Sequence, residues 1–136
     1  MKKNITFMTV ATLLLFVFGC KKSDTQQPQT TLQKIQAKWQ LQTYLENDHY
    51  SGIDHITNSP GSTNDYLDFR SDGKVYVSLF GSKDTSTYSI LNDTKIIFDS
   101  YALFDIKTLT ANSFIMYGKQ TYGSSDFDEQ TYTMIK

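Results

Sequence analysis

Two Asp-His dipeptides are the first residues in this sequence that could do chemistry. They are Asp48-His49 and Asp54-His55, and they contain the only two histidines of the chain. Imidazole and carboxylate groups bind zinc and other divalent ions, and they also act as general acids and bases. No third histidine completes a ligand set, and Asp-His pairs are common in solvated loops. His49 and His55 are therefore weak metal candidates, expected to lie together in one polar loop at residues 46–64.

Three carboxylates gather near the C-terminus, at Asp126, Asp128 and Glu129. Carboxylate oxygens suit calcium, but no glycine-bearing calcium loop surrounds these residues, so a solvated turn is expected. The sequence also contains no G-x-S-x-G, P-loop, H-E-x-x-H or dinucleotide fingerprint. We therefore expect no enzyme, no catalytic residues and no cofactor. An envelope hydrolase or metal site built on the His49/His55 loop is the lowest-ranked alternative.

Cys20 is the only cysteine, which excludes an internal disulfide and any zinc or iron–sulfur site built from several cysteines. It follows a positive start, Lys2 and Lys3, and an uncharged run at residues 4–19. A membrane-spanning helix needs about 20 apolar residues, so this run is short for one and is typical of a signal peptide.

The four residues Val17-Phe18-Gly19-Cys20 resemble the bacterial lipobox, with a branched apolar residue three places before the cysteine and a small one directly before it. The resemblance implies signal cleavage between Gly19 and Cys20 and lipidation of Cys20. Residues 1–19 would then be the signal peptide, and residues 20–31 the lipidated cysteine and a flexible tether. The expected partner is a membrane, reached through this lipid anchor. Because Lys21 is not the aspartate that retains enteric lipoproteins in the inner membrane, we expect an outer-membrane lipoprotein, facing the periplasm or exposed at the surface.

Composition narrows the class of the remaining chain. The 136 residues carry 13 basic and 14 acidic side chains, a net charge of −1, which excludes the basic footprint of a nucleic-acid-binding protein. Aromatic residues make up 14% of the chain, and disordered chains are poor in them. A folded, β-rich domain is therefore favoured.

Periodicity predicts a short helix followed by strands. Thr30 and Thr31 can cap a helix that carries Leu32 and Ile35, and the period then changes to two from Lys38 onward. We expect eight strands, at residues 38–45, 66–70, 74–80, 85–91, 95–100, 103–109, 113–119 and 129–136, with polar loops at 46–64 and 120–128. In the first strand Trp39, Leu41, Thr43 and Leu45 should share one face. The prediction is an all-β fold, an antiparallel up-and-down meander that closes into a small barrel with a short N-terminal helix.

Several segments of this meander resemble the lipocalin-like domains found on lipoproteins of the Bacteroidetes group. They are residues 37–41 (AKWQL), 66–74 (YLDFRSDGK), 88–93 (YSILND) and 106–110 (IKTLT). The resemblance implies a lipocalin-like barrel at residues 32–136, with Trp39 at its base beneath the helix. Ala37 stands where lipocalins have glycine, and Lys136 where they pack an arginine over the tryptophan.

The strands supply inward-facing side chains that could line a ligand site at the barrel mouth beside the 46–64 loop. These candidates are Leu41, Phe69, Val77, Phe98 and Met116. The leading hypothesis is a non-enzymatic, lipid-anchored envelope lipoprotein whose barrel binds a small apolar or amphipathic ligand. The alternative is a filled-core barrel that acts as a protein-interaction or peptidase-inhibitor-like module. The aromatic side chains fit either hypothesis, and they fit a plain core as well; they are Tyr76, Phe80, Tyr88, Tyr117 and Tyr132.

Overall fold

A computed structural model describes residues 28–136; the predicted signal peptide, its expected cleavage site at Gly19 and Cys20, and most of the predicted tether lie outside this part of the chain. The described chain is one short helix and nine strands, so the all-β prediction is confirmed. The elements are α1 (Thr31–Ile35), β1 (Lys38–Tyr50), β2 (Ile53–Pro60), β3 (Tyr66–Phe69), β4 (Lys74–Leu79), β5 (Ser82–Leu91), β6 (Lys95–Phe98), β7 (Ala102–Leu109), β8 (Ser113–Tyr122) and β9 (Asp126–Ile135).

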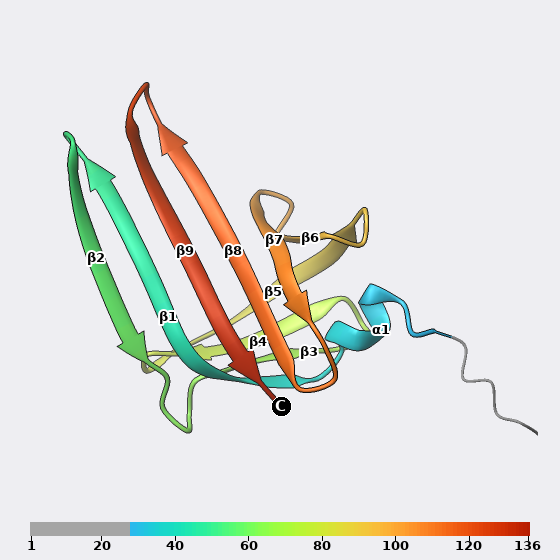
Figure 1. Cartoon of the computed structure of the whole chain (residues 1–136). Coiled ribbons are helices and arrows are strands. Elements are labelled where there is room, and N and C mark those ends of the chain that lie inside the picture. Colours follow the sequence, from blue (N-terminus) through green and yellow to red (C-terminus); the bar gives the residue numbers. More distant parts are fainter. Residues whose placement is uncertain (1–27) are drawn as a thin grey trace, which may run out of the picture.

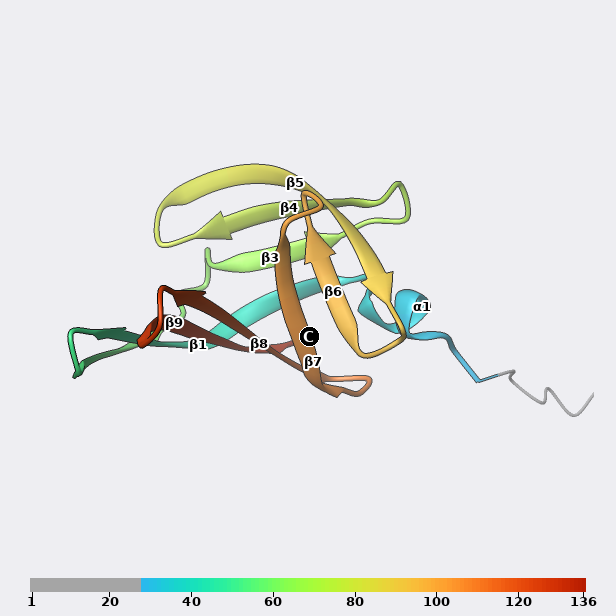
Figure 2. The same ribbon diagram turned by 90° about the horizontal axis from the view of Figure 1, so that it is seen from above.

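Eight of the strands close into an antiparallel barrel. The order is β1-β3-β4-β5-β6-β7-β8-β9, and β9 pairs with β1 to complete the ring. Figure 2 shows β3, β4 and β5 in one layer and β1, β8 and β9 in another, with β6 and β7 crossing between them. The meander prediction is therefore confirmed, with one addition: β2 pairs with β1 outside the ring.

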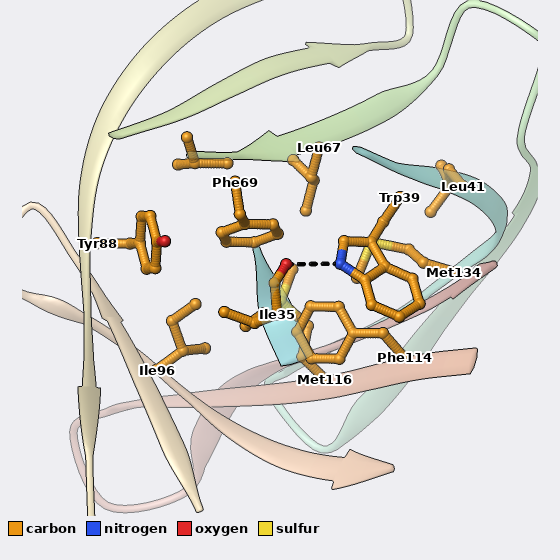
Figure 3. Packing of buried hydrophobic residues seen from close by; sticks show 11 residues of the cluster. Ile35, Trp39, Leu41, Leu67, Phe69, Tyr88, Ile96, Phe114, Met116 and Met134 are labelled. Atoms are coloured by element: carbon orange, nitrogen blue, oxygen red, sulfur yellow. Dashed lines mark hydrogen bonds between the residues drawn. The ribbon is translucent and has the colours of Figure 1, made fainter. Parts of the chain in front are cut away.

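The helix begins where the threonines predicted it. The Thr30 hydroxyl accepts from the Gln33 backbone N–H, and the Gln33 side chain accepts from the Thr30 backbone N–H, which makes a capping box. The side chain of Ile35 is fully buried in the core cluster and holds α1 against one end of the barrel (Figure 3). The helix therefore packs on the base of the barrel through Ile35, while Leu32, Gln33 and Lys34 stay exposed.

Trp39 is fully buried beneath this helix, where its indole Nε1–H donates to the Ile35 carbonyl oxygen at 2.8 Å (Figure 3). Its ring lies 5.5 Å from that of Phe114, and the Lys136 Nζ lies 4.5 Å from the indole centroid. Lys136 thus makes a cation–π contact with the tryptophan. These contacts join the helix, the first strand and the C-terminus at the base of the barrel.

The first strand changes face part of the way along. The pairing of β1 with β9 shifts register between Leu41 and Thr43, so Gln42 is an extra residue in a β-bulge. Beyond the bulge Tyr44 packs against the core, while Leu45 is 43% exposed. The predicted alternation, with Thr43 and Leu45 on the same face as Trp39, is therefore wrong after residue 41, because one inserted residue reverses the side to which every later side chain points.

Both predicted polar loops are wrong as well, because they are largely hairpin strands. β1 continues to Tyr50 and turns at Ser51-Gly52 into β2; β8 continues to Tyr122 and turns into β9 at Asp126. The φ angles of Ser51 and Gly52 are +52° and +80°, the pair of left-handed conformations that a two-residue type I′ hairpin turn requires.

These extended hairpins stand beyond the barrel. The pairing of β1 with β3 ends at Gln40, and that of β7 with β8 ends at Gly118, but β2, β1, β9 and β8 stay paired with one another past those points. Figure 1 shows the four strands rising side by side, away from β3–β7. We call this region the projecting sheet: residues 43–50, 53–60, 118–122 and 126–132. Its inner face continues the barrel interior, and its outer face continues the barrel exterior.

Candidate functional site

The two Asp-His dipeptides lie on the two paired strands of one hairpin, Asp48-His49 on β1 and Asp54-His55 on β2. His49 pairs in register with Asp54 and Asp48 with His55, so the two histidines lie on opposite faces of the projecting sheet. They cannot bind one ion together, and the expectation that both lie in one loop is wrong. Within residues 28–136, no three His, Cys, Asp or Glu side chains are grouped to hold a metal ion.

The outer face of the projecting sheet has its charges paired. His49 Nδ1 lies 2.7 Å from Asp54 Oδ1, and this hydrogen bond is the main reason that the pKa of Asp54 is lowered. Lys119 Nζ donates to Glu129 at 2.7 Å, which in the same way lowers the pKa of Glu129. Between these pairs lies the ring of Phe127, stacked on His49 at 4.7 Å, with Lys119 Nζ 3.7 Å from its centroid. On the outer face, Asp54 and Glu129 are therefore each hydrogen-bonded to a basic side chain.

The inner face is acidic. Glu46, Asp48 and Asp128 line a hollow of about 330 Å³ together with His55, Thr57 and Tyr122. Glu46 accepts a hydrogen bond from the Tyr44 hydroxyl at 2.8 Å, and Asp128 Oδ2 accepts one from the Gln130 amide at 2.9 Å.

Asp128 carries one of its carboxylate oxygens in a buried position. Its Oδ1 is buried and has no hydrogen-bond partner. Burial raises the pKa of this carboxyl, and the negative charges of Glu46 and Asp48 raise it further. The three carboxylates that the sequence groups near the C-terminus do not stay together. Strand alternation puts Asp128 on the inner face and Glu129 on the outer face.

Aromatic rings close the barrel below this acidic hollow. The ring of Tyr44 lies 4.9 Å from that of Tyr132 and 5.5 Å from that of Phe80, while Phe104 packs against Tyr132 at 5.9 Å. Burial raises the pKa of Tyr132 to about 12, and burial together with the bond to Glu46 raises the pKa of Tyr44. Both phenols therefore stay protonated, and Tyr44 keeps its role as a hydrogen-bond donor to Glu46.

The proposed ligand-lining residues lie in or against the packed core. Leu41, Phe69 and Met116 are buried in the hydrophobic cluster of Figure 3, and Val77 and Phe98 are half-buried against it. Phe69 alone has three aromatic neighbours within about 6 Å, namely Tyr88, Phe98 and Phe114. All five candidates therefore belong to the packed core or lie against it.

The five aromatic residues that the sequence left ambiguous divide by face. Tyr88 and Tyr132 belong to the packed interior, and Phe80 is half exposed beside Tyr44. Tyr76 lies outside, 4.4 Å below the Arg70 guanidinium, and Tyr117 lies outside with Lys107 Nζ 4.9 Å from its ring. The aromatic surplus therefore serves both the core and cation–π contacts on the exterior.

The free edge of β2 is the feature that sequence reasoning missed. A two-residue turn makes Tyr50 and Ile53 a hydrogen-bonded pair, so Asp54, Ile56 and Asn58 direct their backbone N–H and C=O groups away from β1. Among the described strands, none pairs with this edge. Pro60 ends the strand, as expected where a backbone N–H would face solvent.

The exposure of β2 is correspondingly high. Every residue from Ile53 to Asn58 is exposed, with Ile56 at 69% and Ile53 at 59%. Two signals in the sequence point to this hairpin: the glycine after Ser51, which permits a tight turn, and Pro60, which suits an edge strand.

Comparison of the chain with known protein-family models, curated proteins and solved structures finds no match. Within residues 28–136, no helix has the length and apolar character needed to cross a membrane. The function is therefore inferred from the geometry of the barrel and the projecting sheet.

Proposed function

We propose that this chain is a non-enzymatic envelope lipoprotein, anchored in the outer membrane through Cys20, whose barrel supports a protein-interaction sheet. The projecting sheet is the observation that carries this proposal. It is an ordered sheet of four paired strands, and no other described strand covers its two faces or pairs with the β2 edge. Proteins commonly protect an exposed edge with lysines, bulges or a covering loop. β2 carries a charge at Asp54 and ends at Pro60, but it has no lysine and presents Ile53 and Ile56 to solvent, which is typical of a strand that pairs with another chain.

The packed interior supports this function over small-ligand binding. The five candidate lining residues contact the core cluster, and the rings of Phe80, Tyr44, Tyr132 and Phe104 lie above it. A ligand inside the barrel would have to displace aromatic side chains that contact one another. A filled barrel that acts through its surface needs no such rearrangement. If the protein partner were a peptidase, the same surface would act as a peptidase inhibitor.

Site-specific photocrosslinking in the native envelope tests the proposal. A photoreactive amino acid replaces Ile56 on the β2 edge, and in a matched variant it replaces Leu91, an exposed apolar residue of the barrel wall (43% exposed). We expect a discrete adduct of higher mass from position 56 and none from position 91. Equal adducts from both positions, or none from position 56, would contradict an interaction through the projecting sheet.

The ligand-binding alternative has its own readout. Trp39 is the only tryptophan and is packed in the core, so its emission reports on the interior. We expect its spectrum to stay unchanged during titration with fatty acids, sterol-like compounds and haem-like compounds. A saturable shift with any of them would favour the ligand-binding barrel.

A further inference from the structure

We propose, building on this interaction function, that the partner of the β2 edge is an extended segment in which apolar residues alternate with lysine or arginine. The segment would add to β2 as a further strand, with its basic side chains over the inner face and its apolar side chains over the outer face. Three features of the projecting sheet carry this inference: the unpaired backbone of β2, the different charge of the two faces, and the small side chain of Thr57 on β2 opposite Glu46.

The backbone of β2 supplies the docking groups. Asp54, Ile56 and Asn58 each direct one N–H and one C=O group outward, so an incoming strand can form a ladder of hydrogen bonds without displacing any described strand. The hairpin is held in place before a partner binds, because the Ser51 N–H donates to Asp126 Oδ1 of the neighbouring hairpin at 3.1 Å. Binding would therefore order the partner more than it orders β2.

The two faces of the sheet differ in charge. On the outer face, Asp54 is hydrogen-bonded to His49 and Glu129 to Lys119, so each of these acids already contacts a basic side chain. On the inner face of the described strands, strand alternation places four acids, Glu46, Asp48, Asp126 and Asp128, with His55 and no lysine or arginine. The buried, unpartnered Oδ1 of Asp128 lies among these acids. A cationic side chain from a partner would complement this face, and an acidic one would be repelled.

The distances suit a long basic side chain. Neighbouring strands lie about 4.8 Å apart, so an added strand would lie about 10 Å from β1, which carries Glu46 and Asp48. The β2 residue opposite Glu46 is Thr57, which is small and lines the acidic hollow. A lysine or arginine on the added strand could therefore extend over Thr57 toward Glu46. On the outer face, an apolar partner residue would lie beside Ile56, which is 69% exposed.

The test is the binding of a fluorescent seven-residue peptide of alternating valine and lysine to the full chain in neutral detergent, measured by anisotropy. We expect saturable binding that weakens as salt rises. The inner-face double variant Glu46→Gln/Asp128→Asn should weaken binding at least about tenfold. The outer-face double variant Asp54→Asn/Glu129→Gln removes the same charge and should stay within about twofold of the parent. Equal loss in both would show non-specific attraction and overturn the proposal.

Two controls separate strand addition from charge alone. A peptide N-methylated at every residue keeps its side chains but loses its backbone donors, and it should not bind. Ile56→Pro removes an outward N–H of β2 and should abolish binding. Ile56→Lys keeps the backbone but replaces the apolar neighbour of the peptide valines with a charged side chain, and it should weaken binding. Unchanged affinity of either the methylated peptide or the Ile56→Lys variant would overturn the proposal.

A second copy of this chain is the competing occupant. Sedimentation of the parent chain should give a monomer; a dimer that Ile56→Lys dissociates would overturn the cationic partner. If photocrosslinking from position 56 succeeds while the basic peptide fails to bind, the interaction function stands and this further inference fails. If the crosslink itself is absent, the proposed function fails first.

Discussion

Gly118 is the last residue of β8 that pairs with β7, and replacing it with alanine should destabilise the barrel at the point where the projecting sheet begins. A Cβ atom at this position would lie 2.6 Å from Cε1 and 2.8 Å from Cδ1 of Phe104. An ordinary contact begins near 3.4 Å, so the Phe104 ring would have to move by about 0.8 Å. Phe98 packs on this ring at 5.5 Å and Tyr132 at 5.9 Å, both edge to face, so the movement disturbs two aromatic contacts.

Overpacking of this kind costs about 1–3 kcal/mol, and edge-to-face pairs contribute about 0.5–1.5 kcal/mol each. We therefore expect Gly118→Ala to lower the free energy of unfolding by about 2 kcal/mol and the Tm by roughly 8–12 °C for a domain of this size. Urea unfolding followed by Trp39 emission, together with a thermal scan by circular dichroism, measures both quantities.

A double-mutant cycle tests the cause of this loss. In a Phe104→Leu background the ring is gone, so the additional cost of Gly118→Ala should fall by at least about 1 kcal/mol. Thr121→Ala, on an exposed part of the same strand, should change stability by less than about 0.5 kcal/mol and serves as the control. A cost of Gly118→Ala that is the same in both backgrounds would refute the packing account.

Three further predictions concern other parts of the fold. Burial and neighbouring acids raise the pKa of Asp128 in the folded chain, so ionisation opposes folding: the stability associated with this group is greatest below its ordinary pKa of 3.8 and is lost as pH rises through the raised value. Asp128→Asn should therefore be more stable than the parent at about pH 7, with the gain vanishing near about pH 3, as measured by urea unfolding at both pH values. Ser51→Asn should raise stability by about 0.5 kcal/mol, because Asn-Gly is the preferred type I′ pair, and an unchanged or lower unfolding midpoint would contradict the turn assignment. Trp39→Phe should cost about 2 kcal/mol, because the Ile35 carbonyl loses its donor and the core loses volume; calorimetry would show the loss as a lower Tm.

The barrel strands were predictable because each has a buried face. Alternation is visible in β3 and β4, where Leu67, Phe69 and Val75 point inward, and the Asp72-Gly73 turn between them has the φ of +79° at glycine that its sequence suggests. The helix was equally visible, because Thr30 caps it through its own side chain. In these segments local sequence and tertiary packing agree.

The projecting sheet was not predictable by the same means. β2 buries almost nothing, so its sequence carries no alternation of apolar and polar residues, and it resembles a loop. The bulge at Gln42 arises from pairing with β9, which lies more than 80 residues later, and no local signal in β1 announces it. The residues of the candidate site, the Asp-His pairs and the carboxylates, could therefore be picked out from the sequence. Their division between the two faces of the sheet could not.

The length of β1 has a mechanical consequence. One continuous strand, β1, begins beneath α1, forms part of the barrel wall and ends at the turn into β2. A pulling force between the N-terminal end and a partner held on β2 would run along this strand. The hydrogen bonds between β1 and β2 would then bear the load in parallel, in shear, rather than opening one after another. A chain arranged in this way should resist detachment under tension far better than its equilibrium stability alone indicates.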